Sequence, residues 1–205
     1  FSDTLSKPTA PMLRAMTEAE VGAEQKGEDP TTRKLEEKVA ELTGHSAALF
    51  FPSATMANEI ALMALCERGD ELIAAENCHL FEAESGGPAI HAQVLARPIA
   101  TENGVFSSED IRANFQYART PLTPISRAVS VENTANMGGG IAWTKEQLES
   151  IIGVCEELDL RRHLDGARLF NAVVRSGLSA KTIASRFDTV TVCLSKGLGC
   201  PMGAV

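Results

Sequence analysis

The chain has 205 residues, a formal net charge of −8 and 44% hydrophobic residues, which is enough for one domain with a full core. The acidic balance without a basic cluster argues against a nucleic-acid partner, and no apolar run reaches the ~18 residues of a membrane span, so we expect neither nucleic acid nor a membrane as partner. The five cysteines form no CxxC pair, which predicts reduced thiols in a cytoplasmic protein.

Apolar periodicity and turn residues predict an alternation of helices and strands along the whole chain. In the first half, Thr31 or Thr32 is expected to cap a helix that Gly44 ends. The other helices are expected at 11–20, in the apolar segment that follows 52–58 and ends at 66, from 107 or 108 onward, and at 145–158, 169–176 and 179–186. The strands are expected at 46–51, 71–75, 93–99, 128–134, 161–165 and 189–194.

Such an alternation predicts an α/β fold with three layers, in which helices cover both faces of a mostly parallel sheet. In sheets of this kind, ligands bind beyond the carboxyl ends of the strands. The polar side chains at or just after the predicted strand ends are therefore candidates for a site. They are Ser53, Thr55, His79, Glu132, Asn133, Asp165, Arg168 and Lys196.

Taken one at a time, these residues have ordinary structural explanations. Ser53 and Thr55 can simply cap a helix, although a helix N-terminus after a strand also suits a phosphate. His79 can be a structural histidine, and Asp165 and Arg168 can pair with each other. Lys196 can reach solvent, although a partly desolvated amine at a strand end also suits a Schiff base. The gathering of all eight at one edge favours a functional site.

An anion cradle, an acid, an arginine and a terminal lysine are the groups that hold pyridoxal 5'-phosphate. The whole chain resembles the fold-type I pyridoxal-phosphate enzymes, specifically the low-specificity threonine aldolases of the β-eliminating lyase group. The resemblance implies a large domain like that of aspartate aminotransferase. The matching motifs are Ser2-Asp-Thr, Gly27-Glu-Asp-Pro-Thr31, Phe51-Pro-Ser-Ala-Thr-Met-Ala-Asn58, His79, Ala118-Arg-Thr120, Glu132-Asn-Thr134, Asp165-Gly-Ala-Arg-Leu-Phe-Asn-Ala172 and Leu194-Ser-Lys-Gly-Leu-Gly199.

The resemblance also implies roles for the residues that would hold the cofactor. Lys196 would carry it covalently, Asp165 would keep its ring nitrogen protonated, and His79 would stack on the ring and act as the base. The cofactor's phosphate would bind at Ser53, Ala54 and Thr55.

Substrate binding is the second group of implied roles. Ser2 and Arg168 would bind the substrate carboxylate, Arg168 as a planar fork, and Arg168 belongs to the cofactor-binding set as well. Gln116 would lie on the substrate side. No metal site is expected.

Four positions depart from the family pattern. Ala54 replaces a glycine in the phosphate turn, and Lys26 replaces an aromatic residue expected near a neighbouring subunit's site. Gln116 and Ala135 replace two histidines. The cofactor set is therefore intact, whereas the substrate side is altered.

The leading hypothesis is retro-aldol cleavage of a β-hydroxy-α-amino acid to glycine and an aldehyde. A racemase or β-eliminating lyase with the same cofactor is the second, and a catalytically weakened subunit that acts by association is the third. The resemblance implies a homodimer or homotetramer with sites between subunits. It divides the chain into an N-terminal segment, 1–20, and an incomplete cofactor-binding domain, 21–205, that lacks a small C-terminal domain. Phe1 at the start leaves a removed upstream segment open.

Overall fold

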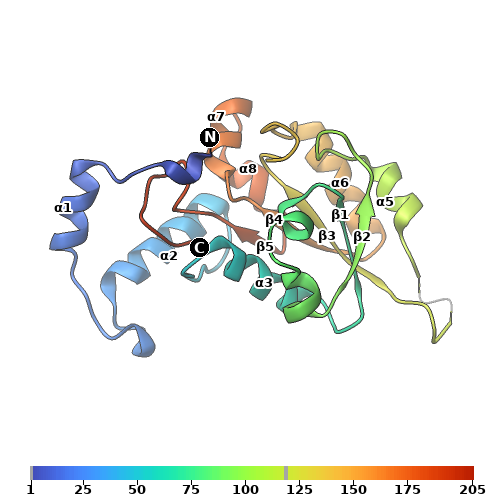
Figure 1. The fold of residues 1–205 in the computed structure, drawn as a ribbon, viewed down its shortest axis with the longest axis horizontal. Coiled ribbons are helices and arrows are strands. Elements are labelled where there is room, and N and C mark those ends of the chain that lie inside the picture. Colours follow the sequence, from blue (N-terminus) through green and yellow to red (C-terminus); the bar gives the residue numbers. More distant parts are fainter. Residues whose placement is uncertain (1, 118–119) are drawn as a thin grey trace.

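The computed structural model describes residues 2–117 and 120–205, and it contains a parallel sheet with flanking helices (Figure 1). The strands are β1 (Glu71–Ala75), β2 (Leu95–Ile99), β3 (Ser126–Glu132), β4 (Arg161–Asp165) and β5 (Thr189–Thr191). The α-helices are α1 (Ala10–Glu18), α2 (Pro30–Thr43), α3 (Ala54–Leu65), α4 (His79–Glu82), α5 (Ser108–Asn114), α6 (Lys145–Glu157), α7 (Leu169–Ser176) and α8 (Ala180–Ala184). Short turns of other helix types lie at η1 (Asp3–Leu5), η2 (Glu24–Lys26) and η3 (Pro88–Ala92).

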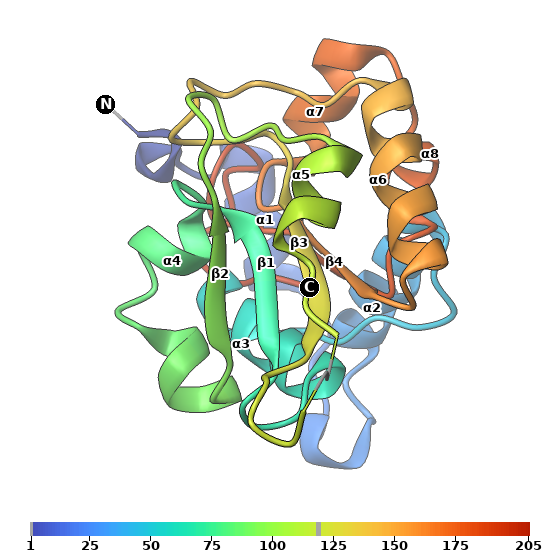
Figure 2. The same cartoon turned by 90° about the vertical axis from the view of Figure 1, so that its right-hand side faces the viewer.

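The five strands run in the order β2-β1-β3-β4-β5, and every neighbouring pair is parallel. Helices α5 and α6 pack on each other beside the sheet, whereas α3 contacts β4 and β5 (Figure 2). This is the three-layer α/β architecture that the alternation of elements predicts. All five carboxyl ends therefore meet at one edge.

Burial explains why the central elements form where the sequence predicts them. Every residue of β1 is buried, as expected for a strand covered on both faces. Helix α6 begins with a capping box between Thr144 and Gln147 and buries the face that its apolar spacing predicts. The predicted bounds of β1, β4 and α7 match the structure.

Two predicted strands at the edge of the sheet differ from the structure. Residues 46–51 form no strand, because their one bridge joins Phe51 to Ala204 and the Phe50 N–H donates to the side chain of Glu36 instead. The predicted strand 189–194 divides after Thr191. Its remainder pairs antiparallel with residues 203–205, through bonds such as Leu194 N–H to Gly203 O at 2.9 Å.

Smaller differences concern the ends of elements. Asp29, not Thr31 or Thr32, caps α2: its Oδ1 accepts from the Thr32 N–H at 2.7 Å, and Pro30 occupies the first helical turn, where its missing N–H costs nothing. The left-handed Gly44 ends the helix as predicted. Strand β2 begins two residues later than expected because Gln93 is left-handed.

No helix in ranges 2–117 and 120–205 combines the length and the apolar character needed to cross a membrane. Two residues of the predicted motif Ala118-Arg-Thr120 lie outside the described residues.

Candidate active site

Buried polar groups gather where β3, β4 and β5 end. Asp165 closes β4 and is 2% exposed, and Lys196 lies in the turn beyond β5 and is 9% exposed. Glu132 closes β3 and is also buried. Ionisable groups are almost never buried unless they are paired or functional, so this edge is the candidate active site.

Asn58 on α3 fixes the carboxyl of Asp165. Its Nδ2 donates to Asp165 Oδ2 at 3.2 Å and to Glu84 Oε1 at 2.8 Å. The Ala167 N–H donates to the other oxygen of Asp165 at 3.1 Å. Because amide and N–H donors stabilise a carboxylate, they hold Asp165 in one orientation.

His163, on β4, also belongs to this hydrogen-bond network. Its Nε2 lies 3.2 Å from Asn58 Oδ1, and its Nδ1 lies 2.9 Å from Thr189 Oγ1. Burial lowers the pKa of His163, so the ring is neutral. Since Asn58 Oδ1 can only accept, Nε2 carries the proton and Nδ1 accepts from the Thr189 hydroxyl.

His79 begins α4, directly after β1. Its Nδ1 lies 2.8 Å from Glu84 Oε1, and its backbone N–H donates to Glu132 Oε2 at 3.1 Å. The hydrogen bond that the ring makes to the Glu84 carboxylate raises the pKa of the imidazole, whereas burial and the charge of Lys196 lower it. One side-chain atom from each of His79, Glu84 and Asp165 lies within 4.8 Å of the other two. Within this cluster, the Nδ1 of His79 is already bonded to Glu84, which leaves its Nε2 as the free ring nitrogen.

The predicted phosphate turn lies at the start of α3. The Ser53 hydroxyl caps the helix by accepting from the Met56 N–H at 3.2 Å. The N–H groups of Ala54 and Thr55 lie in the first turn, where a helix has free donors and a positive dipole end. The Phe51–Ala204 bridge ties this turn to the strand pair that carries Lys196. The geometry suits a phosphate.

Arg168 lies at the start of α7 and contacts the N-terminal segment. Its Nε and Nη2 donate to the two carboxyl oxygens of Asp3 at 2.9 and 2.8 Å. The Arg168 guanidinium and the Lys196 charge lower the pKa of Asp3. A cavity of about 600 Å³ opens beside this pair, and Ser2 and Asn171 also line it. Asp3 thus occupies the Nε and Nη2 side of the guanidinium fork that was predicted to bind a substrate, and Nη1 is the nitrogen left for another ligand.

We expect Asp3→Asn to loosen Arg168, because an amide keeps one hydrogen bond but loses the charge. The KM for a carboxylate substrate should rise about 10-fold, as for loss of one charged hydrogen bond, with a smaller change in kcat. Steady-state kinetics measures both. Because the pKa of Asp3 is depressed, the contact is retained above pH ~4 and is lost only as the pH falls further. An unchanged KM would show that Asp3 does not orient the arginine.

Three predicted positions do not join this group. The Gln116 N–H donates to the Ser126 hydroxyl at 2.9 Å, and the Gln116 carbonyl accepts from the Ser126 N–H at 3.1 Å. Ser126 is the first residue of β3, so Gln116 lies at the opposite edge of the sheet in this chain. Lys26 is exposed at the end of η2. Ala135 is buried against Gly104.

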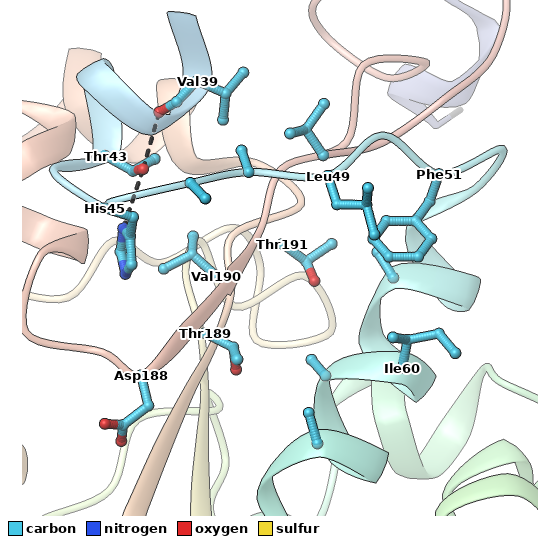
Figure 3. A pocket seen from close by; sticks show the side chains of 16 residues that line it. Val39, Thr43, His45, Leu49, Phe51, Ile60, Asp188, Thr189, Val190 and Thr191 are labelled. Atoms are coloured by element: carbon cyan, nitrogen blue, oxygen red, sulfur yellow. Dashed lines mark hydrogen bonds between the residues drawn. The ribbon is translucent and has the colours of Figure 1, made fainter. Parts of the chain in front are cut away.

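Another cavity, of about 230 Å³, lies between segment 47–51, α3 and β5 (Figure 3). Its lining is mostly apolar, with Leu49, Phe51 and Ile60 on one side and Val190 on the other. It contains none of the predicted site residues, so it is not the candidate active site.

Sequence reasoning missed the residues that support the site: Asn58, Glu59, Glu84 and His163. A signal existed for two of them, because Asn58 and Glu59 interrupt an otherwise apolar helix. Asn58 bonds Asp165 at the strand ends and Glu59 lies against Gly87, and neither contact could be seen in the sequence.

A buried lysine and acid, with a half-buried histidine, lie beside a helix N-terminus at the carboxyl edge of a parallel sheet, which is an α/β architecture with one polar site. A family model described as β-eliminating lyase matches residues 1–205. The chain therefore belongs to the β-eliminating lyase family.

The similar proteins match the whole of this chain and are longer than it. The chain is 39% identical to low-specificity L-threonine aldolase 1 of Arabidopsis thaliana over 207 residues and to the low-specificity L-threonine aldolase of Escherichia coli K12 over 210 residues, covering 58% and 60% of them. It is 42% identical to an uncharacterized Caenorhabditis elegans protein and covers 49% of it.

Solved structures agree with the fold. A Leishmania major threonine aldolase superposes with a TM-score of 0.86 at 24% identity, over 99% of this chain and 60% of that one. A putative L-allo-threonine aldolase from Listeria monocytogenes has a TM-score of 0.78 at 29% identity, over 98% of this chain and 56% of that one. The chain thus spans about half to three-fifths of the relatives it matches.

Proposed function

We propose that the full-length protein is a pyridoxal-phosphate-dependent aldehyde-lyase that cleaves a β-hydroxy-α-amino acid, such as threonine or allo-threonine, to glycine and an aldehyde. The observation that carries this proposal is the joint burial of Asp165 and Lys196 at one sheet edge beside His79. Family membership and the threonine aldolases among the relatives support it.

The residues fit the cofactor by the chemistry of their groups. Asp165 offers a buried, oriented carboxylate to a ring nitrogen, and Lys196 offers a primary amine, which can bind a carbonyl group reversibly. The start of α3, with Ser53, Ala54 and Thr55, offers N–H and hydroxyl donors to a phosphate. When bound, pyridoxal phosphate supplies an electron sink for the electron pair of the broken Cα–Cβ bond.

Substrate groups would be held by residues around the N-terminal segment. Arg168, held by Asp3, would bind the carboxylate with Ser2 beside it, and the cavity there provides the space. We leave Gln116 out of this set because of its position at the opposite edge.

His79 would remove the proton of the β-hydroxyl group while the Cα–Cβ bond breaks and the aldehyde leaves. Its Nδ1 is held by Glu84, so Nε2 is the atom that accepts the proton. A base must be deprotonated, and the pKa of His79 is raised. Activity should therefore rise as the pH passes a value above 6.5.

We also propose a homodimer or homotetramer with sites between subunits. No residue of α1 is buried within the chain, and Leu13 and Met16 on it are half exposed, which leaves an apolar face for a second copy. Residues 1–20 would form this N-terminal segment and 21–205 the cofactor-binding domain, in a cytoplasmic enzyme.

The test is to load full-length protein with pyridoxal phosphate and add L-threonine, L-allo-threonine and phenylserine in turn. Aldehyde release, followed with a coupled dehydrogenase, supports the proposal. A different result would move the assignment to a racemase or β-eliminating lyase. That result is solvent deuterium at Cα of alanine or serine, or pyruvate from serine, without aldehyde from any β-hydroxy amino acid. The altered positions Lys26 and Gln116 are the reason to test this alternative.

A further inference from the structure

A second buried carboxyl lies behind the histidine of the site. Glu59 follows Asn58 on α3 and is 5% exposed, although nothing in the proposed reaction uses it. It lies against the connection between α4 and η3, where Gly87 packs so closely on its carboxyl that any side chain at 87 would collide with it. A charged group in such a place needs a partner or must be neutral.

Both Glu59 and Glu84 have buried carboxyl oxygens without a hydrogen-bond partner among the described residues. Neither oxygen of Glu59 nor Oε2 of Glu84 has a hydrogen-bond partner in the described part of the chain. The other oxygen of Glu84 is fully used, because it accepts from Asn58 and bonds His79. Two carboxylates cannot hydrogen-bond each other, but a carboxylic acid and a carboxylate can. One added proton therefore satisfies the pair.

We propose that Glu59 and Glu84 share one proton between their unpartnered carboxyl oxygens, so that Glu59 is a positioning residue that sets the charge of the pair behind His79. The effect on catalysis rests on the proposed function, whereas the shared proton does not.

The electrostatics of the pair agree with this arrangement. Burial, with the hydrogen bond and charge of Glu84 next, raises the pKa of Glu59 to about 8. Glu84 is the one charged group that acts strongly on Glu59. Beyond Glu84 lie His79 on α4, and Asp165 and His163 on β4.

The charge balance follows from this stoichiometry. Below about pH 8 the pair carries one negative charge beside the His79 ring. Loss of the shared proton adds a second negative charge behind the ring, which favours the imidazolium. Interacting groups of this kind titrate in coupled steps, so His79 should show two steps.

The experiment is carbon-13 NMR on full-length protein labelled in glutamate carboxyl and histidine ring carbons, without and with pyridoxal phosphate. We expect one glutamate carboxyl to titrate near pH 8 in the wild type and to be missing in Glu59→Gln. The glutamine amide donates to Glu84 permanently, so His79 should then titrate in a single step.

Glu59→Leu removes the donor and should raise the pKa of His79 by about one unit, with the acid limb of the pH–rate profile moving equally. Glu59→Gln should restore the limb to within about 0.3 units of the wild type. Should the leucine variant fail to fold, the glutamine variant alone carries the test.

Glu82→Gln, on the exposed side of α4, is the matched control and should change neither titration. A Glu59 carboxyl that titrates below pH ~5, as an ordinary glutamate does, would overturn the proposal. Because the titrations need no turnover, failure of the proposed function, seen as absence of aldehyde, leaves this result readable.

Discussion

Lys196→Ala is expected to abolish both cofactor attachment and activity. Lys196 lies in a turn beyond β5 and is 9% exposed, and its amine is the group that we propose to bind the cofactor's carbonyl carbon. Removal of a covalent group costs about 10³-fold or more in rate. The visible absorption of protein loaded with pyridoxal phosphate, together with aldehyde release, measures both effects.

Lys34→Ala is the matched control, since Lys34 is exposed on α2 and should leave the absorption and the rate unchanged. If the Lys196 variant kept the visible band of the wild type, the cofactor would be attached elsewhere, and the assignment of this edge would be wrong.

Asp165→Asn is expected to reduce kcat/KM on the order of 10³-fold, which is typical for loss of one preorganised charge at the reacting group. The amide is nearly the same size, so the fold should survive. The asparagine side chain has no negative charge to keep a pyridine nitrogen protonated. It also has one acceptor oxygen where Asp165 has two, so it cannot accept from both Asn58 and the Ala167 N–H in the same way.

Its measurement is kcat/KM together with the cofactor dissociation constant and thermal stability. Asp159→Asn provides the control, because Asp159 is exposed and left-handed, a conformation that asparagine tolerates. A loss of activity explained entirely by unfolding would remove the catalytic interpretation of Asp165.

The sequence predicted best the elements whose burial comes from their own pattern. Strand β1 and helix α7 have the expected bounds because a continuous apolar run and an apolar stripe each determine one structure. The segment 46–51 failed for the opposite reason. Its apolar residues look like a strand, but a strand needs a partner, and Phe51 alone finds one, in Ala204. The sequence of one segment does not show which distant segment it pairs with.

The candidate site also has a part that the sequence predicts and a part that it does not. Strand order places Asp165 and the turn with Lys196 at a common edge, so their proximity could be predicted from alternation and from the resemblance. The partner of Arg168 could not be predicted in this way, because Asp3 reaches it from the other end of the chain. The partner of Glu59 could not be predicted either, because Glu59 and Glu84 come close only in the folded chain. Gln116, which the resemblance places on the substrate side, lies at the far edge of the sheet within this chain.

Strand β5 has a practical consequence for handling the chain. It is the last strand in the sheet order, and its outer side faces the apolar cavity of Figure 3, with Leu49 and Ile60 partly exposed at that cavity. An uncovered strand edge with apolar flanks is a template for pairing with another extended chain. We therefore expect this edge to be a point at which copies of the protein self-associate when β5 is left unpaired on its outer side.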